Sequence, residues 1–151
     1  MPIIILMLAA VLQSTPQTSS NHLELTGKWQ ETSTDLKRSQ QQELNISHEE
    51  NRIAIEKSFA GARRIVLMYY CDNKEHLVQT NDKGTQFLTR AKCLADAILT
   101  TTTIKNGPVS IITNERWTLK PDSHHLVVES KTEQGMATNS AHFRTEFLKI
   151  D

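Results

Sequence analysis

The residues of this chain that could do chemistry form no recognised catalytic or metal-binding pattern. Of six histidines, His124 and His125 are adjacent, so on a strand they would point to opposite faces and could not simply share one ion. The sequence contains no His-Glu-x-x-His, Cys-x-x-Cys or Asp-rich calcium loop, and no Gly-x-Ser-x-Gly or phosphate-binding glycine loop. It therefore predicts no metal, no cofactor and no catalytic residue. An enzyme whose residues carry no recognisable motif is the least favoured class.

Cys71 and Cys93 are the only cysteines, so a single pairing exists. A disulfide closing a loop of about 20 residues would stabilise the fold by roughly 3 kcal/mol. The alternative is two buried free thiols. The choice depends on the compartment, because disulfides persist mainly in oxidising ones.

The first twenty residues have the pattern of a secretory signal peptide. Residues 3–12 are an unbroken apolar run, and residues 13–20 are polar and mostly small. The run is too short for a stable membrane span, which needs about 20 apolar residues. The segment before it carries no Lys or Arg, and the alternative is a buried strand. We expect a signal peptide at 1–20, a domain at 21–151, and a secreted or periplasmic protein.

The charge balance argues against nucleic acid as a partner. The chain has 17 basic and 17 acidic residues, which gives a formal net charge of zero. No net field therefore attracts nucleic acid or an anionic membrane surface.

The elements that must position these residues are short strands. Residues 115–131 form the clearest hairpin, in which Trp117 and Leu119 alternate with polar residues before a turn, and Leu126 and Val128 follow it. No window has a helical apolar stripe. The pattern predicts an all-β fold, a single antiparallel meander of about 8–10 strands closing into a barrel, because closure removes exposed edges. The expected strands are residues 23–30, 42–47, 52–59, 63–71, 76–80, 85–93, 97–105, 109–120, 124–131 and 141–150.

Gly27-Lys28-Trp29 on the first strand resembles the Gly-x-Trp of lipocalins. With residues 72–76, 91–103 and 115–122, it makes the chain similar to the small lipocalin-like, calycin-type barrels of exported bacterial proteins of unknown role. We expect lipocalin-like architecture and not a lipocalin proper, because lipocalins carry a helix after the barrel and this sequence has a strand pattern there instead. The resemblance implies that Gly27 and Trp29 help to close the barrel under a basic residue near the last strand. Arg144 is the candidate, with Lys149 as the alternative.

A barrel of this size either holds one small ligand or fills its interior with side chains. The first hypothesis is a small apolar or amphipathic ligand, and the second is a non-enzymatic structural or interaction domain with a filled core. Tyr69 and Tyr70 are adjacent, so one faces inward and could offer a polar tip on an apolar body. The oligomeric state is left open. The candidate ligand-binding residues are Trp29, Met68, Tyr69, Tyr70, Trp117 and Phe143.

Overall fold

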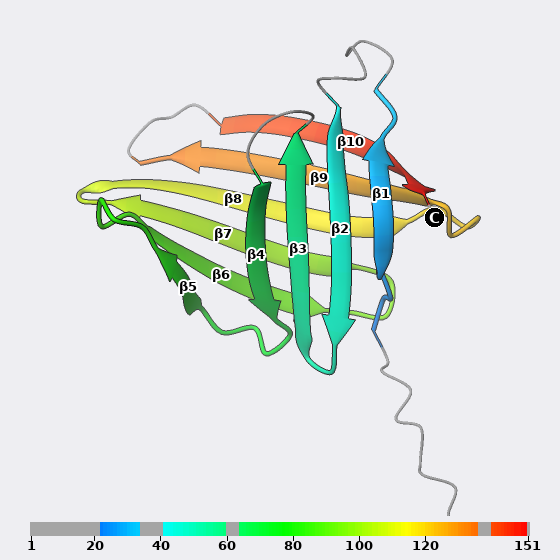
Figure 1. Cartoon of the computed structure of the whole chain (residues 1–151), viewed down its shortest axis with the longest axis horizontal. Helices are drawn as coiled ribbons and strands as arrows, with labels where there is room; N and C mark the ends of the chain where they lie inside the picture. The colour runs from blue at the N-terminus through cyan, green and yellow to red at the C-terminus, as the bar shows by residue number, and fades with distance from the viewer. Residues whose placement is uncertain (1–21, 34–40, 60–63, 136–139, 151) are drawn as a thin grey trace, which may run out of the picture.

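The computed structural model describes residues 22–33, 41–59, 64–135 and 140–150, which form ten strands and no helix (Figure 1). The predicted signal peptide lies outside the described residues. Within these ranges no helix is long and apolar enough to cross a membrane. The strands are β1 Gly27–Glu31, β2 Gln42–Glu49, β3 Arg52–Phe59, β4 Arg64–Tyr70, β5 His76–Thr80, β6 Gln86–Cys93, β7 Ile98–Asn106, β8 Val109–Leu119, β9 His125–Gln134 and β10 Ser140–Ile150.

All ten strands belong to one antiparallel sheet. Its order is β4-β3-β2-β1-β10-β9-β8-β7-β6-β5, so sequential neighbours pair and β1 also pairs with β10. The pairing of the first and last strands rolls the meander into a nearly closed barrel. The predicted all-β, lipocalin-like meander is therefore confirmed.

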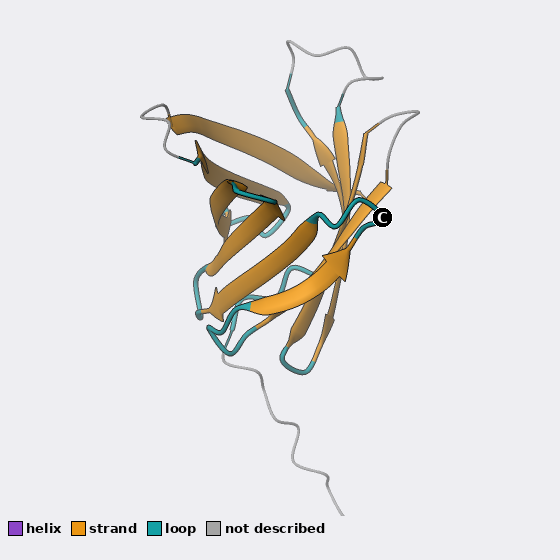
Figure 2. Ribbon diagram, turned by 90° about the vertical axis from the view of Figure 1, so that its left-hand side faces the viewer, coloured by secondary structure: helices purple, strands orange, loops and turns teal. Residues whose placement is uncertain are grey.

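The two halves of the rolled sheet cross at a wide angle. Strands β1–β4 lie in front in Figure 1, and β6–β10 pass behind them. Figure 2 shows the same barrel from the side, with the sheet curled back on itself. We call the end that carries the β2–β3 and β8–β9 turns the closed end. The open end is the opposite one, where β3 ends at Phe59 and β10 begins at Ser140.

Between β4 and β5 the described strands form no ladder, and other interactions hold the barrel together. Cys71, which follows β4, forms a disulfide with Cys93 at the end of β6, with Cα atoms 5.3 Å apart. The Asn73 amide donates a hydrogen bond to the Ala91 carbonyl at 2.8 Å. Of the two alternatives for the cysteines, the disulfide is therefore the one in the structure. It clamps the barrel where strand pairing is interrupted.

The first strand begins later than predicted, because residues 23–26 run across the closed end instead of joining the sheet. The Leu23 amide donates to the Leu94 carbonyl at 2.8 Å, and the Leu25 side chain is buried. The Trp29 indole N–H donates to the Leu25 carbonyl at 3.0 Å. His22 Nε2 also lies 2.8 Å from His48 Nε2 on β2. These contacts close this end of the barrel over Trp29.

The basic residue that covers Trp29 is Lys149, the alternative to Arg144. Its ammonium nitrogen lies 5.4 Å from the Trp29 ring centroid. Gly27 makes room for it, because a Cβ on Gly27 would lie 2.8 Å from Lys149 Cε, and its φ of 139° disfavours other residues. The prediction that Arg144 covers Trp29 is wrong, because Arg144 lies on the outer face. Strand alternation turns it away from the lumen, and it lies near the Glu129 carboxylate.

Trp117 is almost fully buried, at 1% exposure, and its neighbour Arg116 faces outward. We expect Trp117→Ala to lower the free energy of unfolding by ~3–5 kcal/mol, because it leaves a large cavity in the core. Arg116→Ala should change it by less than about 0.5 kcal/mol. Urea denaturation measures both. A loss below about 1 kcal/mol for Trp117→Ala would contradict the inward register of β8.

Candidate functional site

The lumen at the closed end is filled by apolar side chains. They alternate along the strands with outward residues, as a half-buried sheet requires. Buried aromatic rings from β1, β4, β8 and β10 meet the aliphatic residues of β2, β3, β7 and β9 there. We call this set the apolar floor; its main residues are Trp29, Leu44, Ile46, Ile53, Ile55, Leu67, Tyr69, Ile98, Trp117, Leu126, Val128 and Phe147.

Above the floor the inward positions become polar. On β3, Ile53 and Ile55 are followed two residues later by Lys57, and on β8 the position two before Trp117 is Glu115. The same change occurs on β7 and β9, where hydroxyl side chains follow buried aliphatic ones. We call these inward residues the polar layer: Lys57, Thr100, Thr102, Thr113, Glu115, Ser130 and Thr132.

An ion pair spans the lumen in the polar layer. Lys57 Nζ on β3 lies 3.0 Å from Glu115 Oε1 on β8, and the side chains are only 19% and 10% exposed. The Thr100 hydroxyl donates to Glu115 Oε2 at 3.3 Å and accepts from the Trp117 indole N–H at 3.1 Å. The ammonium also lies 5.2 Å from the Trp117 ring centroid, within cation–π range. Both charges are thus held in place by neighbours of fixed geometry.

Tyr69 joins the floor to the polar layer. Its ring is fully buried, and its hydroxyl lies 2.8 Å from the Thr102 hydroxyl. Burial, reinforced by the negative charge of Glu115, raises the pKa of Tyr69 well above its usual value. The phenol therefore stays neutral and can both donate and accept. Thr113 and Thr132 form a further hydroxyl pair at 3.1 Å.

A third layer, at the open end, is apolar again but exposed. By strand alternation Phe59, Ile65 and Phe143 face the lumen side, yet they are 44%, 39% and 61% exposed. Ile104 and Ile111 occupy equivalent positions on β7 and β8 and are partly buried. We call these five residues the apolar rim. A molecule entering from the open end meets the rim first and the polar layer second.

Stability alone does not explain the polar layer. A buried ion pair loses much of its attraction to desolvation, and an apolar pair of similar volume is often as stable or more stable. Among the described residues no buried side-chain nitrogen or oxygen lacks a partner, so the layer is satisfied without a ligand. Its charges and hydroxyls can still exchange these partners for a polar group of similar geometry. The layer thus presents hydrogen-bond donors and acceptors at fixed positions inside the barrel.

The six predicted ligand-binding residues are dispersed. Trp29, Tyr69 and Trp117 are packed in the floor, where they support the polar layer and leave no surface for a ligand. Phe143 lies on the rim. Met68 and Tyr70 do not face the lumen as predicted. They lie on the outer face, because they alternate with Tyr69, which points inward. The Tyr70 ring lies against His76, with centroids 4.4 Å apart.

The sequence-based list omitted the residues that define the layer, Lys57 and Glu115. The signal for both was present in the strand period. Extending the inward positions Ile53 and Ile55 by two residues reaches Lys57, and stepping back two from Trp117 reaches Glu115. A charge at an inward position of an otherwise apolar strand face is unusual and indicates a site.

No group of three or more His, Cys, Asp or Glu side chains that could hold a metal ion occurs among the described residues. Two of the described histidines lie beside surface carboxylates. His76 Nε2 is 2.9 Å from Asp72, and His125 Nδ1 is 2.6 Å from Asp122.

The fold and the layered lumen define a lipocalin-like β-barrel, and comparison with solved structures agrees. Secretory abundant heat soluble protein 4 from Ramazzottius varieornatus is 16% identical with a TM-score of 0.55, and the match covers 83% of this chain and 94% of that protein. A second secretory abundant heat soluble protein from the same organism is 13% identical with a TM-score of 0.52, at the same coverage. At such identities the likeness concerns the fold. No family model and no curated protein matches the chain.

The ion pair predicts a specific pattern of stabilities. Lys57→Met leaves the mostly buried Glu115 carboxylate without its cation and should lower the free energy of unfolding by about 1–3 kcal/mol. The double variant K57M/E115L removes both charges and should lie within about 1 kcal/mol of wild type. Urea denaturation of the three proteins checks this. A double variant less stable than the single one would show that the pair itself stabilises the barrel.

Proposed function

We propose that the protein binds a small amphipathic molecule in the open half of its barrel. The molecule places its apolar part against Phe59, Ile65 and Phe143 and its polar group on the polar layer. The observation that carries this proposal is the order of the three layers. A solid core would place its charges outermost, whereas here charged and hydroxyl side chains lie beneath exposed apolar ones.

The chemistry of the layer indicates what polar group it would accept. Lys57 supplies N–H donors, Glu115 supplies an acceptor, and the hydroxyls of Tyr69 and the threonines can do either. The two formal charges cancel. The layer therefore suits a polar group that both donates and accepts hydrogen bonds, or a carboxylate that competes with Glu115 for Lys57.

The alternative function is a structural or interaction domain that works only through its outer surface. The tightly packed floor favours it for the closed half of the barrel. The exposed rim does not, because apolar side chains turned toward a filled lumen should be covered. The two functions differ in one respect: the alternative predicts no saturable binding of an amphipathic probe.

The binding test uses dansyl-undecanoic acid, a fluorescent amphipathic probe, in a titration of the folded protein. We expect saturable binding with a stoichiometry of one. K57M/E115L should weaken it at least fivefold, because a polar group buried without partners costs about 1–3 kcal/mol. Phe143→Ser should also weaken it, through the lost apolar contact.

The matched control for this test is K120M/E146L, which removes an ion pair of similar length, 2.7 Å, on the outer face. It should bind the probe like wild type. Absence of saturable binding to the wild-type protein would rule out the proposed function. An equal loss in the control and test variants would show that the probe does not reach the polar layer.

We further propose that the protein is exported to an oxidising compartment. The apolar run at residues 3–12 and the Cys71–Cys93 disulfide support this. Expressed with its own leader in a secreting host, the protein should leave the cytosol, lose about 20 residues and contain no alkylatable thiol. Intact-mass measurement before and after alkylation checks both points. Full-length protein retained in the cytosol with two reactive thiols would contradict export.

A further inference from the structure

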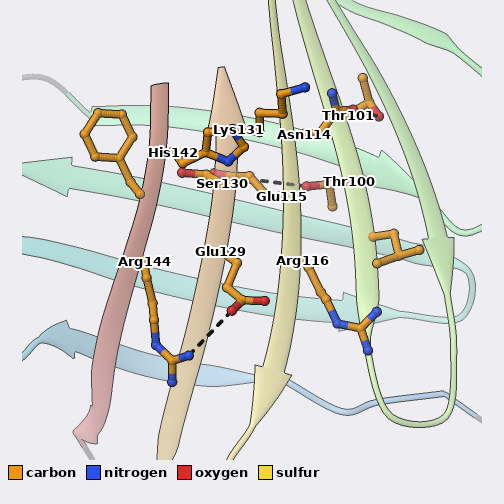
Figure 3. A pocket seen from close by; sticks show the side chains of 12 residues that line it. Thr100, Thr101, Asn114, Glu115, Arg116, Glu129, Ser130, Lys131, His142 and Arg144 are labelled. Atoms are coloured by element: carbon orange, nitrogen blue, oxygen red, sulfur yellow. Dashed lines mark hydrogen bonds and ion pairs between the residues drawn. The ribbon is translucent and has the colours of Figure 1, made fainter. Parts of the chain in front are cut away.

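A groove of about 750 Å³ lies on the outer face of β7, β8, β9 and β10. Figure 3 shows Arg116, Glu129 and Arg144 side by side across three neighbouring strands of this face. We call it the outer groove. Its charged residues Arg116, Glu129 and Arg144 lie on the opposite face of the sheet from the polar layer, so the site does not rest on the proposed function. The lumen-facing residues that also border it are Thr100, Glu115, Ser130 and Phe143. Its volume falls within the range of small-molecule sites.

The strand register places polar side chains in two rows that run across β8, β9 and β10 in the outer groove. Glu129 on β9 pairs with Arg116 on β8 and with Arg144 on β10. In the next outward row, Lys131 lies between Asn114 and His142. Cationic side chains from three adjacent strands therefore converge on one concave surface, although the whole chain has no net charge.

Lys131 is already paired with Glu133, at 2.5 Å, whereas the two arginines of the groove are only weakly neutralised. Arg116 is 3.9 Å from its carboxylate partner, the exposed Asp96, and Arg144 is 3.5 Å from Glu129 and 3.3 Å from Glu146. These distances exceed those of strong charge-assisted hydrogen bonds, about 2.7–2.9 Å. Glu115 also borders the groove through its backbone, but its carboxylate points into the lumen toward Lys57. Among the described residues lining the groove, Glu129 is the one carboxylate that faces outward.

The positions of the two arginines set the size of a partner. Neighbouring strands are about 4.8 Å apart, so β8 and β10 are separated by about 10 Å. Guanidinium groups bind carboxylate and phosphate oxygens through paired N–H donors. A small molecule with two or three anionic groups could engage Arg116 and Arg144 together and displace Glu129 from between them.

We propose that the outer groove is a binding site for a small polyanion whose oxyanion groups bind Arg116 and Arg144. Both polycarboxylates and polyphosphates present this chemistry. Glu129 occupies the site in the absence of a ligand and competes with it. The outer groove would select a ligand by its negative charge and the spacing of its oxyanion groups, whereas the lumen would select an amphipathic ligand.

Isothermal titration calorimetry with citrate and, separately, with inorganic tripolyphosphate tests the proposal. At low ionic strength we expect saturable binding of at least one anion, and the comparison identifies the preferred oxyanion. R116Q/R144Q should weaken binding at least tenfold. Glu129→Gln should strengthen it several-fold, because it removes the internal competitor.

The control variant is R64Q/R90Q, which removes two exposed arginines outside the groove and lowers the net charge equally. It should change affinity less than twofold. Phe59→Ser, which changes the lumen side at a residue that does not line the groove, should also leave anion binding unchanged and so separates this site from the lumen. Equal losses in R116Q/R144Q and R64Q/R90Q, weaker binding by Glu129→Gln, or no saturable binding of either anion would overturn the proposal.

Discussion

The pairing of β1 with β10 is the interaction on which the rest of the structure depends. It joins the two ends of the meander, with Trp29 opposite Lys149, and so converts a sheet with two faces into a barrel with an inside and an outside. The Cys71–Cys93 disulfide completes closure on the far side, where β4 and β5 do not pair. Once the barrel is closed, strand alternation assigns every side chain to the lumen or to the outer face.

The lumen contains one layer that stabilises the fold and one that carries a desolvation cost. The apolar floor supplies the burial that stabilises the fold, whereas the Lys57–Glu115 pair brings charge into the interior at a desolvation cost. The pair is tolerated because Thr100 and the Trp117 ring hold it and because the open end leaves part of it hydrated. Phe59 and Phe143 then expose apolar surface above the charges. Folding does not require this order of layers, and the ligand binding that we propose would explain it.

The sequence was sufficient for the fold, because the period of two and the regularly spaced turns are local signals. It also placed Trp117 inward and identified the Gly27-Lys28-Trp29 strand. It did not separate Lys149 from Arg144, because that choice depends on the register between β1 and β10, which are far apart in the chain. It also did not decide which of Tyr69 and Tyr70 faces inward, because residues 65–70 are apolar or aromatic at every position and show no alternation. The Lys57–Glu115 contact joins strands β3 and β8, and only the crossing of the two halves of the sheet brings them together.

The central claim is that a ligand occupies the upper lumen and leaves the floor untouched. Isoleucine residues lie in both layers, so methyl NMR of isoleucine-labelled protein during titration with dansyl-undecanoic acid tests it directly. We expect saturable shifts for Ile65, Ile104 and Ile111 on the rim, and small or no shifts for Ile53, Ile55 and Ile98 in the floor. Larger shifts in the floor than on the rim, or no saturable shift in either layer, would contradict it.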